Sequence, residues 1–291
     1  MKNRCFFPLL FFSLFCCLTC KSPPPPPEET PVSTLYFDHI EAESISRIVL
    51  YYRLWTENPL PLPLNLKIGG WKAVVDGHEY DLNNVSLACD TVSAGEARIE
   101  VPAGGGAEKM LRLDLNLGAS PAASGNSGDY RAELRVDLVY QYDQRRPLAG
   151  TAAALAVFPR IREPEFTITA IAIMQAELIN TRFRVSLRID NPNVFPVDLS
   201  SFGYELYGAG RFWADGREED VLHIPALGSA ETRLFLMMNF INMKRSLLDE
   251  VIALRQVRYR FTGEAEVGTG VSWLPRFHMG FDHTGNSAVY K

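Results

Sequence analysis

One set of sequence landmarks occurs twice in this chain, in the same order, and it constrains the fold more than any other feature. Residues 32–161 and residues 162–291 span 130 positions each. In both halves a run of alternating apolar residues leads into an Asn-Pro pair, which is Asn58-Pro59 in the first half and Asn191-Pro192 in the second. Self-similarity of this kind predicts that one structural unit is repeated along the chain.

Two further landmarks keep the same order. The turn at Val101-Pro102 is matched by Ile224-Pro225, and Phe158-Pro159-Arg160 is matched by Leu274-Pro275-Arg276. The offset between matching positions falls from 133 at the Asn-Pro pairs to 123 and then to 116. Because the offset shrinks within the unit, the insertions are placed inside the first copy and not between the copies.

Each half consists of short runs in which apolar and polar residues alternate, separated by Gly, Pro, Asn and Asp. Period-two alternation predicts strands with one buried and one solvated face, as in antiparallel sheets. We therefore predict a mainly β protein with two tandem immunoglobulin- or fibronectin III-like β-sandwich domains. The first, divergent domain covers residues 33–162 and the second covers residues 163–291, with the joint near Arg162-Glu163-Pro164.

One amphipathic helix is predicted in the second domain. Apolar residues recur at helical spacing from Met243 to Leu254, and charged residues occupy the opposite face. We interpret the apolar stripe as a cap over one open end of the sandwich, with a membrane-surface or partner-binding helix as the alternative. The equivalent span of the first half, residues 118–129, has the composition of a loop, so no helix is expected there.

The N-terminal residues 1–19 are predicted to form a signal peptide. Lys2 and Arg4 precede a thirteen-residue apolar run from Phe6 to Leu18, which is interrupted by one proline and one serine. A bilayer span needs roughly 20 apolar residues, which makes an uncleaved transmembrane helix the less favoured interpretation. Four of the five cysteines lie within the first 20 residues, so no disulfide framework is expected in the rest of the chain.

The end of the apolar run, Leu18-Thr19-Cys20, resembles the lipobox of bacterial lipoproteins, in which the cysteine becomes the lipidated first residue. The resemblance implies lipidation of Cys20, with Cys17 as a competing site and plain secretion as the alternative. Residues 20–32 include five consecutive prolines and are predicted to form an extended stalk, with a proline-ligand role as the alternative. The expected location is the bacterial cell envelope, lipid-anchored on the periplasmic face of the membrane or at the cell surface.

The second half carries a longer motif between Ile179 and Pro275. An alternating strand runs into NPN, a proline-containing apolar continuation, a Tyr-containing strand and a Gly-rich segment, all within NPNVFPVDLSSFGYELYGAGRFWADG (191–216). A proline-glycine turn and an apolar strand follow in IPALGSAETRLFL (224–236). This arrangement resembles the WHy domain of group 2 late embryogenesis abundant proteins. Residues 45–159 resemble it more weakly, because NPN is replaced by NPL.

The resemblance implies an immunoglobulin-like or fibronectin-like sandwich with one helix, an association with desiccation and water stress, and no known catalytic residues. We therefore expect a membrane-anchored, extracytoplasmic, non-enzymatic protein that binds or protects envelope components. Its partners are expected to be the membrane, through the lipid anchor, and an unknown protein or envelope component. The alternative is an envelope lipid-binding or lipid-handling module with an apolar cleft in the sandwich, gated by the 243–254 helix.

No catalytic, cofactor-binding or metal-binding residue is predicted, and no cofactor is expected. The sequence contains no HExxH, GxSxG or Walker motif, so a hydrolase has no motif to support it. The one histidine cluster is His278–His283; on a strand, His278 and Asp282 would share a face while His283 points away, which is awkward for a metal site. Cys89 has no evident histidine partner that would make it a nucleophile.

Charge and aromatic content complete the prediction. Lys plus Arg number 29 and Asp plus Glu number 34, a net charge of −5, which argues against nucleic acid as a partner. The aromatic residues Trp71, Tyr204, Phe212 and Trp213 are predicted to pack in the sandwich core or its lid, in preference to forming a ligand platform.

Overall fold

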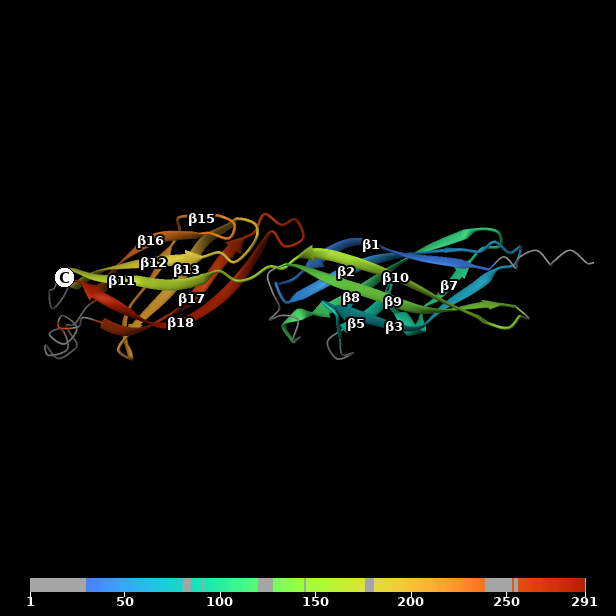
Figure 1. The fold of residues 1–291 in the computed structure, drawn as a ribbon, viewed down its shortest axis with the longest axis horizontal. Helices are drawn as coiled ribbons and strands as arrows, with labels where there is room; N and C mark the ends of the chain where they lie inside the picture. Colours follow the sequence, from blue (N-terminus) through green and yellow to red (C-terminus); the bar gives the residue numbers. More distant parts are fainter. Residues whose placement is uncertain are drawn as a thin grey trace, which may run out of the picture.

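The computed structural model describes residues 30–80, 85–90, 92–119, 128–143, 145–175, 181–238, 253 and 256–290. The described chain is mainly β, as predicted. The predicted signal peptide, Cys17, Cys20 and all but the last residues of the stalk lie outside the described residues, as does the predicted helix except for Ala253. Figure 1 shows an elongated molecule in which two groups of strands lie end to end, with β10 leading into β11 between them.

The first group of strands forms two sheets. Its elements are β1 (Val32–Ala42), β2 (Arg47–Glu57), β3 (Leu64–Val75), β4 (His78–Glu79), β5 (Val85–Cys89), β6 (Val92–Ser93), η1 (Ala94–Glu96), β7 (Arg98–Val101), β8 (Gly106–Asn116), η2 (Leu117–Ala119), β9 (Asp129–Tyr142) and β10 (Leu148–Pro159). One sheet has the order β1-β2-β8-β5-β6, and the other has the order β10-β9-β3-β4 with β7 paired to β3.

The second group forms one eight-stranded sheet. Its elements are β11 (Glu165–Gln175), β12 (Thr181–Asp190), β13 (Val197–Gly208), β14 (Arg211–Glu218), β15 (Leu222–Ile224), β16 (Ser229–Met238), β17 (Gln256–Gly268) and β18 (Arg276–Tyr290). The strand order is β14-β13-β17-β18-β11-β12-β16, with β15 paired to β13. A parallel pairing of β11 with β18 joins what a sandwich would keep as two separate layers. This topology therefore differs from two separate, purely antiparallel sheets.

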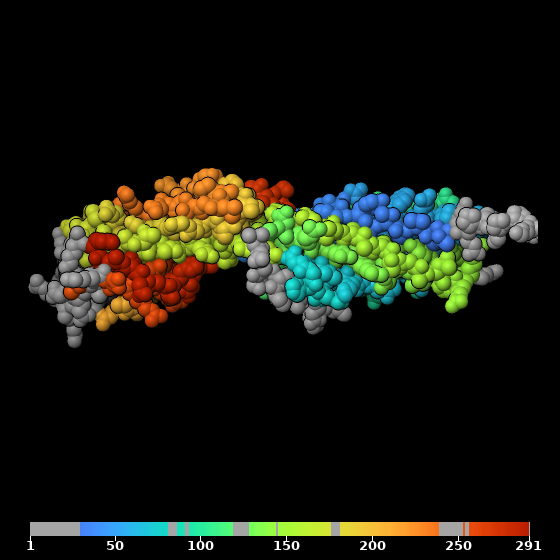
Figure 2. All heavy atoms as spheres, in the orientation of Figure 1, coloured from blue at the N-terminus to red at the C-terminus, as the bar shows by residue number. Residues whose placement is uncertain are grey.

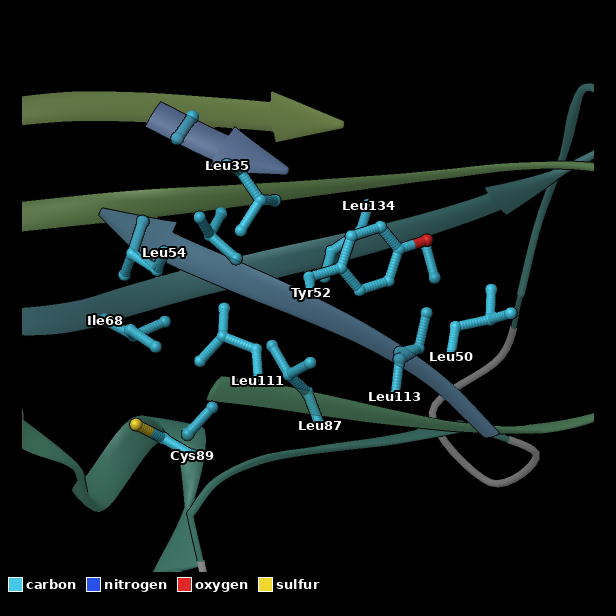
Figure 3. Close-up of a cluster of buried hydrophobic side chains, with 14 of the residues drawn as sticks. Leu35, Leu50, Tyr52, Leu54, Ile68, Leu87, Cys89, Leu111, Leu113 and Leu134 are labelled. Atoms are coloured by element: carbon cyan, nitrogen blue, oxygen red, sulfur yellow. The ribbon is translucent and has the colours of Figure 1, made fainter. Parts of the chain in front are cut away.

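Buried apolar side chains form two clusters, one in each group of strands. The first runs in sequence from Leu35 to Phe158 and the second from Ile161 to Phe281. Figure 3 shows part of the first cluster, where Tyr52 and Cys89 pack among leucines from several strands. Alternate residues of each strand point into a cluster, and burying one leucine or phenylalanine contributes about 1.5–3 kcal/mol.

The two halves touch at a joint made by side chains from both. Trp273 packs against both clusters, and its ring meets that of Phe158 edge-on with the ring centres 6.0 Å apart. The backbone N–H of Arg162 donates to Oδ1 of Asn193 at 2.7 Å, and Nδ2 of Asn193 donates to the Arg162 carbonyl at 2.8 Å. In Figure 2 the blue-to-green lobe and the yellow-to-red lobe meet end to end at this joint.

The two Asn-Pro turns are held by matching hydrogen bonds. Asn58 and Asn191 are both buried, and each side-chain amide donates to two carbonyls that close the turn. The acceptors are Leu62 O (2.7 Å) and Pro102 O (3.0 Å) for Asn58, and Phe195 O (2.8 Å) and Pro225 O (3.0 Å) for Asn191. These acceptors are the residues that the offsets of 133 and 123 pair with each other.

Strand register is matched as well. β2 pairs with β8 and β12 pairs with β16, and the residue partners correspond position by position. Tyr51 lies opposite Arg112 in the first half, and Arg184 lies opposite Phe235 in the second. The two halves can therefore be compared residue by residue on these strands.

Candidate binding surface

The outward face of β12 and β16 combines arginines with large apolar side chains. Along β12 the odd-numbered residues from Thr181 to Ile189 are buried, so the even-numbered side chains point outward. Along the last part of β16, Leu234, Leu236 and Met238 are buried and the residues between them face solvent. We call the outward set, together with a tyrosine of β18, the arginine–aromatic face; it consists of Arg182, Arg184, Arg233, Phe235, Met237 and Tyr290.

Sheet register places these side chains next to one another. Arg184 lies directly opposite Phe235 on one side and Ala172 of β11 on the other, and Ala172 pairs with Tyr290. Residues opposite each other on paired strands have Cβ atoms about 4.5–5.5 Å apart. Arg184 therefore has Phe235 as its neighbour on one side, and on the other side the small Ala172 separates it from Tyr290.

The apolar members of the face are unusually exposed. Phe235 is 71% exposed, the highest value among the exposed large hydrophobic side chains of the described residues, and Tyr290 is 58% exposed. Met237 and the neighbouring Met174 are 56% and 54% exposed. β16 is the edge strand of its sheet, where exposed apolar side chains favour unwanted association. A surface of this kind is therefore expected to have a binding role.

The arginines of the face have no acidic partner in the part of the chain that the structure describes. None of Arg182, Arg184 and Arg233 forms an ion pair with a described residue, whereas Arg188 on the same strand binds Asp190 with Nη2–Oδ1 at 2.7 Å. That hydrogen bond raises the pKa of Arg188. In a chain with a net charge of −5, the face is a local concentration of uncompensated positive charge.

A shallow depression lies at the end of the face. It has a volume of about 400 Å³ and is lined by Met174, Arg182, Phe183, Phe235, Leu236 and Met237. This volume is at the lower end of the range for small-molecule sites, which is about 300–1,000 Å³. The depression brings Arg182, Phe235, Met174 and Met237 to a single opening, while the ring of Phe183 faces the core and stacks on Trp213.

A second, polar hollow of about 390 Å³ lies on the outward face of β13, β17 and β18. Gly203 and Gly280 lie on either side of Glu264 and provide no side chains, so the carboxylate stands in open space. Arg217, Glu266 and His278 line the same hollow. Among the described residues, no group of histidine, cysteine or acidic side chains could hold a metal ion.

The residues of the histidine cluster are placed on opposite faces of β18, as the strand geometry predicts. His278 and Asp282 face outward, and the ring of His283 lies 6.2 Å from that of Phe166. Arg260 binds Asp282 through Nε at 2.7 Å, and this hydrogen bond lowers the pKa of the carboxyl. Asp282 is thus engaged in an ion pair with β17.

The other residues singled out from the sequence lie mostly in the cores. Cys89 is buried, and burial raises the pKa of its thiol. Tyr204 and Trp213 are buried in the second cluster and Trp71 packs partly buried against the first, whereas Phe212 is 45% exposed. None of the described helices is long and apolar enough to span a membrane.

Sequence reasoning did not identify the arginine–aromatic face. The alternation of arginine with apolar residues along 182–190 predicts a strand with one wet face, and the apolar run that begins at Leu234 predicts a further strand, but neither pattern alone indicates a binding surface. The available signal was that both strands alternate: a run that alternates buries half of its residues, so Phe235 and Met237 had to face outward once Leu234 and Leu236 faced inward.

Comparisons with known proteins bear on the second half. Residues 186–282, which are 97 of 291 and span β12 to β18, match the family described as late embryogenesis abundant protein. This match supports a late embryogenesis abundant-type family. No curated protein matches the chain.

Solved structures that resemble the chain do so only distantly. They include a protein from Archaeoglobus fulgidus (12% identity, TM-score 0.27, covering 44% of this chain and 96% of that chain) and the YadV chaperone (11%, 0.25, 86% and 99%). A β-glucuronidase of Bacteroides uniformis is 10% identical with a TM-score of 0.26, covering 80% of this chain and 26% of that chain. TM-scores of this size support no conclusion about fold or function.

Proposed function

We propose that this protein is a non-enzymatic binding protein of the late embryogenesis abundant group 2 (WHy) type. It acts outside the cytoplasm and is held to an envelope membrane by lipid on Cys20. The family match over 186–282 supports the family part of the proposal. The lipobox-like end of the apolar run supports the anchor.

The observation that carries a binding role is the arginine–aromatic face. Its groups are guanidinium, phenyl, phenol and thioether. A guanidinium stays protonated at all physiological pH values, and phenyl and thioether groups do not transfer protons. Such a surface suits the recognition of anionic and apolar groups and does not suit acid–base catalysis.

The position of the face supports an anchored protein that reaches outward. β1 begins at the end of the molecule far from the second half, and the chain terminus marked C in Figure 1 lies at the opposite end, where β11 and β18 also end. A lipid on Cys20, followed by the extended stalk, would hold the first half toward the membrane. The arginine–aromatic face would then be presented away from it.

A site-specific crosslinking experiment tests the binding role. A photoreactive phenylalanine analogue is placed at Met237 in the full chain, expressed in a bacterial envelope, and the adducts are identified by mass spectrometry. The matched control carries the analogue at Phe212, which is also exposed but lies on β14, outside the face. We expect adducts at Met237 and few at Phe212. Equal adducts at both positions, or none at Met237, would contradict the proposal.

The family resemblance adds a role in water stress to the proposal. Cells that produce the protein should survive drying better than cells that lack it, and a variant with Arg184→Gln and Phe235→Ser should not restore survival. The measurement is colony counts after controlled drying and rehydration. Equal survival with and without the protein would remove the stress role while leaving the binding role in place.

A further inference from the structure

We infer that the arginine–aromatic face docks on an anionic lipid bilayer, so that the protein links the membrane that anchors it to a second lipid surface. This inference rests on the proposed function of the same face as a binding surface. It names the partner as a lipid surface with negatively charged headgroups.

The chemistry of the face matches the headgroup region of a membrane. Guanidinium groups bind phosphate oxygens through two parallel hydrogen bonds. Arg182 and Arg233 are exposed and Arg184 is half-buried, and none of them forms an ion pair with a described residue. Phe235 and Met237 extend from the same face with more than half of their surface exposed. Apolar side chains of this kind insert at the boundary between headgroups and acyl chains. Tyr290 adds a ring with an apolar body and a polar tip, the type enriched at membrane interfaces.

The mixing of the two kinds of group favours lipid over a folded protein partner. Arginines and apolar residues are interleaved across neighbouring strands, as the Phe235–Arg184 pairing shows. A protein partner would need one acidic group in fixed register with each guanidinium and an apolar contact between them. Mobile anionic headgroups move to the guanidiniums and close around the inserted side chains, so a fluid surface satisfies the face without such register.

The first half provides an internal control for this inference. The positions that match Arg184 and Phe235 are Tyr51 and Arg112, and those that match Arg182 and Met237 are Val49 and Asp114. In the first half Arg112 Nη2 donates to Asp114 Oδ1 at 2.6 Å, so its charge is compensated. The same strand pair therefore carries a neutralised face in one half and an uncompensated face in the other.

The distance between anchor and face sets what the protein can link. Each half is built from strands of about eleven residues, which are about 36 Å long at 3.3 Å per residue. The two halves lie end to end, with β1 starting at one end and the strands of the face finishing at the other (Figure 1). Anchor and face are thus separated by about 70 Å before the stalk is added. A face so far from the anchor reaches a second bilayer.

A vesicle-tethering experiment tests the inference with the full chain. The protein is reconstituted into neutral phosphatidylcholine vesicles, so that the N-terminal segment is already occupied by lipid. Fluorescent acceptor vesicles contain either phosphatidylcholine alone or phosphatidylcholine with 30% phosphatidylglycerol, and their capture is measured after separation. We expect capture of the anionic vesicles alone, and capture should fall steeply as salt is raised from about 0.1 to 1 M.

Double variants test whether vesicle capture depends on the arginine–aromatic face. Arg184→Gln with Arg233→Gln should weaken capture roughly 30-fold, because each arginine near an anionic surface contributes a factor of about five. The control, Arg53→Gln with Arg112→Gln, removes the same charge from the matched strands of the first half and should leave capture unchanged. Phe235→Ser with Met237→Ser should lower capture while keeping every charge. Circular dichroism melting curves verify that all variants are folded.

The possible outcomes separate this inference from the proposed function. Absence of capture by the folded wild-type protein, or equal losses in the two arginine pairs, would overturn the lipid inference. If capture is absent but the analogue at Met237 forms adducts with one envelope protein, the face is a protein-binding surface and the proposed binding role remains. If neither capture nor adducts occur, the proposed function fails as well.

Discussion

The strand pairs β2–β8 and β12–β16 have the same register, but their outward faces differ in whether the charged side chains have partners. In the first half the outward face is closed by polar contacts: Arg53 Nε donates to Asp38 at 2.6 Å, and Tyr51 donates to Glu41 at 3.0 Å. In the second half the matched side chains form the arginine–aromatic face, which has no described acidic partner. The comparison shows that a repeated framework keeps its turns and register while the exchange of a few outward residues changes what its surface can bind.

The two pairs also differ at their edges. β8 is covered by β5, whereas β16 is the last strand of its sheet among the described residues. Among the described residues no further strand pairs with β16, although β14 and β15 approach it, and Phe235 and Met237 of β16 remain exposed. Compensation of charge and strand pairing at the edge are thus two separate differences between strand pairs of the same register.

The largest expected effect on folding stability comes from substitutions in the two matching Asn-Pro turns. Asn58→Ala and Asn191→Ala each remove two donors to buried carbonyls and should each cost about 3 kcal/mol of folding free energy. If the halves unfold separately, chemical denaturation will show each variant lowering a different transition. Asn286→Ala, at an exposed position of β18, should change stability by less than about 0.5 kcal/mol. Losses under about 1 kcal/mol in both turn variants would show that the matched bonds are not what holds the turns.

The next prediction exchanges one outward residue between the matched strands β8 and β16. Met237→Asp places a carboxylate opposite Arg182, as Asp114 stands beside Arg112 in the first half, and should lower capture of anionic vesicles about tenfold. The reverse change, Asp114→Met, leaves Arg112 without that partner and should give the first half weak capture of its own. Capture that does not respond to Met237→Asp would mean that compensation of charge is not what distinguishes the faces.

A smaller effect concerns the backbone of the proline turns. Gly104 and Leu227 occupy matched positions with backbone φ of +59° and +50°. Residues other than glycine adopt this left-handed conformation at a cost of about 1–2 kcal/mol. Leu227→Gly should therefore stabilise the second half by up to about 1 kcal/mol, after allowing for the added freedom of glycine in the unfolded chain. Gly104→Leu should destabilise the first half by a similar amount. A lower denaturation midpoint for Leu227→Gly, or a higher one for Gly104→Leu, would contradict the equivalence of these two turn positions.

The smallest effect is in the response to pH. The pKa of Asp38 lies below its ordinary value of 3.8 because its carboxylate accepts hydrogen bonds from His39 and then from Arg53. A depressed carboxyl pKa adds stability above pH 4 that is lost as the pH falls through the lowered value. The ion pair between Asp38 and Arg53 is therefore intact from pH 5 to 8. Vesicle capture by the Asp114→Met variant should be constant over that range. A steady change in capture by the Asp114→Met variant between pH 8 and pH 5 would contradict this expectation.

The sequence predicts the repeated framework because that framework depends on local patterns. Alternation specifies which side of β12 is buried, and the Asn-Pro pairs mark the two turns whose carbonyls Asn58 and Asn191 bind. The mainly β character follows from the same patterns. These features need only neighbouring residues, so they can be recognised before any pairing of strands is known.

The surface difference could not be predicted, because it depends on which strands meet. Arg53 is compensated by Asp38, fifteen positions away on β1, and Phe235 stands beside Arg184, which is fifty-one positions away. The parallel pairing of β11 with β18 joins segments more than a hundred residues apart. Without the register, an arginine on an alternating strand looks the same whether or not it has a partner.

The place of Trp273 at the joint has a consequence for how the chain matures. Its ring covers Phe158 of the first core, yet it is made 115 residues later. At about 5–20 residues per second, the first half emerges from synthesis roughly 6–23 seconds before the side chain that completes its end. During that interval the Phe158 ring packs against Tyr130 of its own half, with the ring centres 5.4 Å apart, while the side that Trp273 meets stays uncovered. The end of the first core is therefore completed only after the second half has been made, so the last contact of the first half to form is one that depends on the second half.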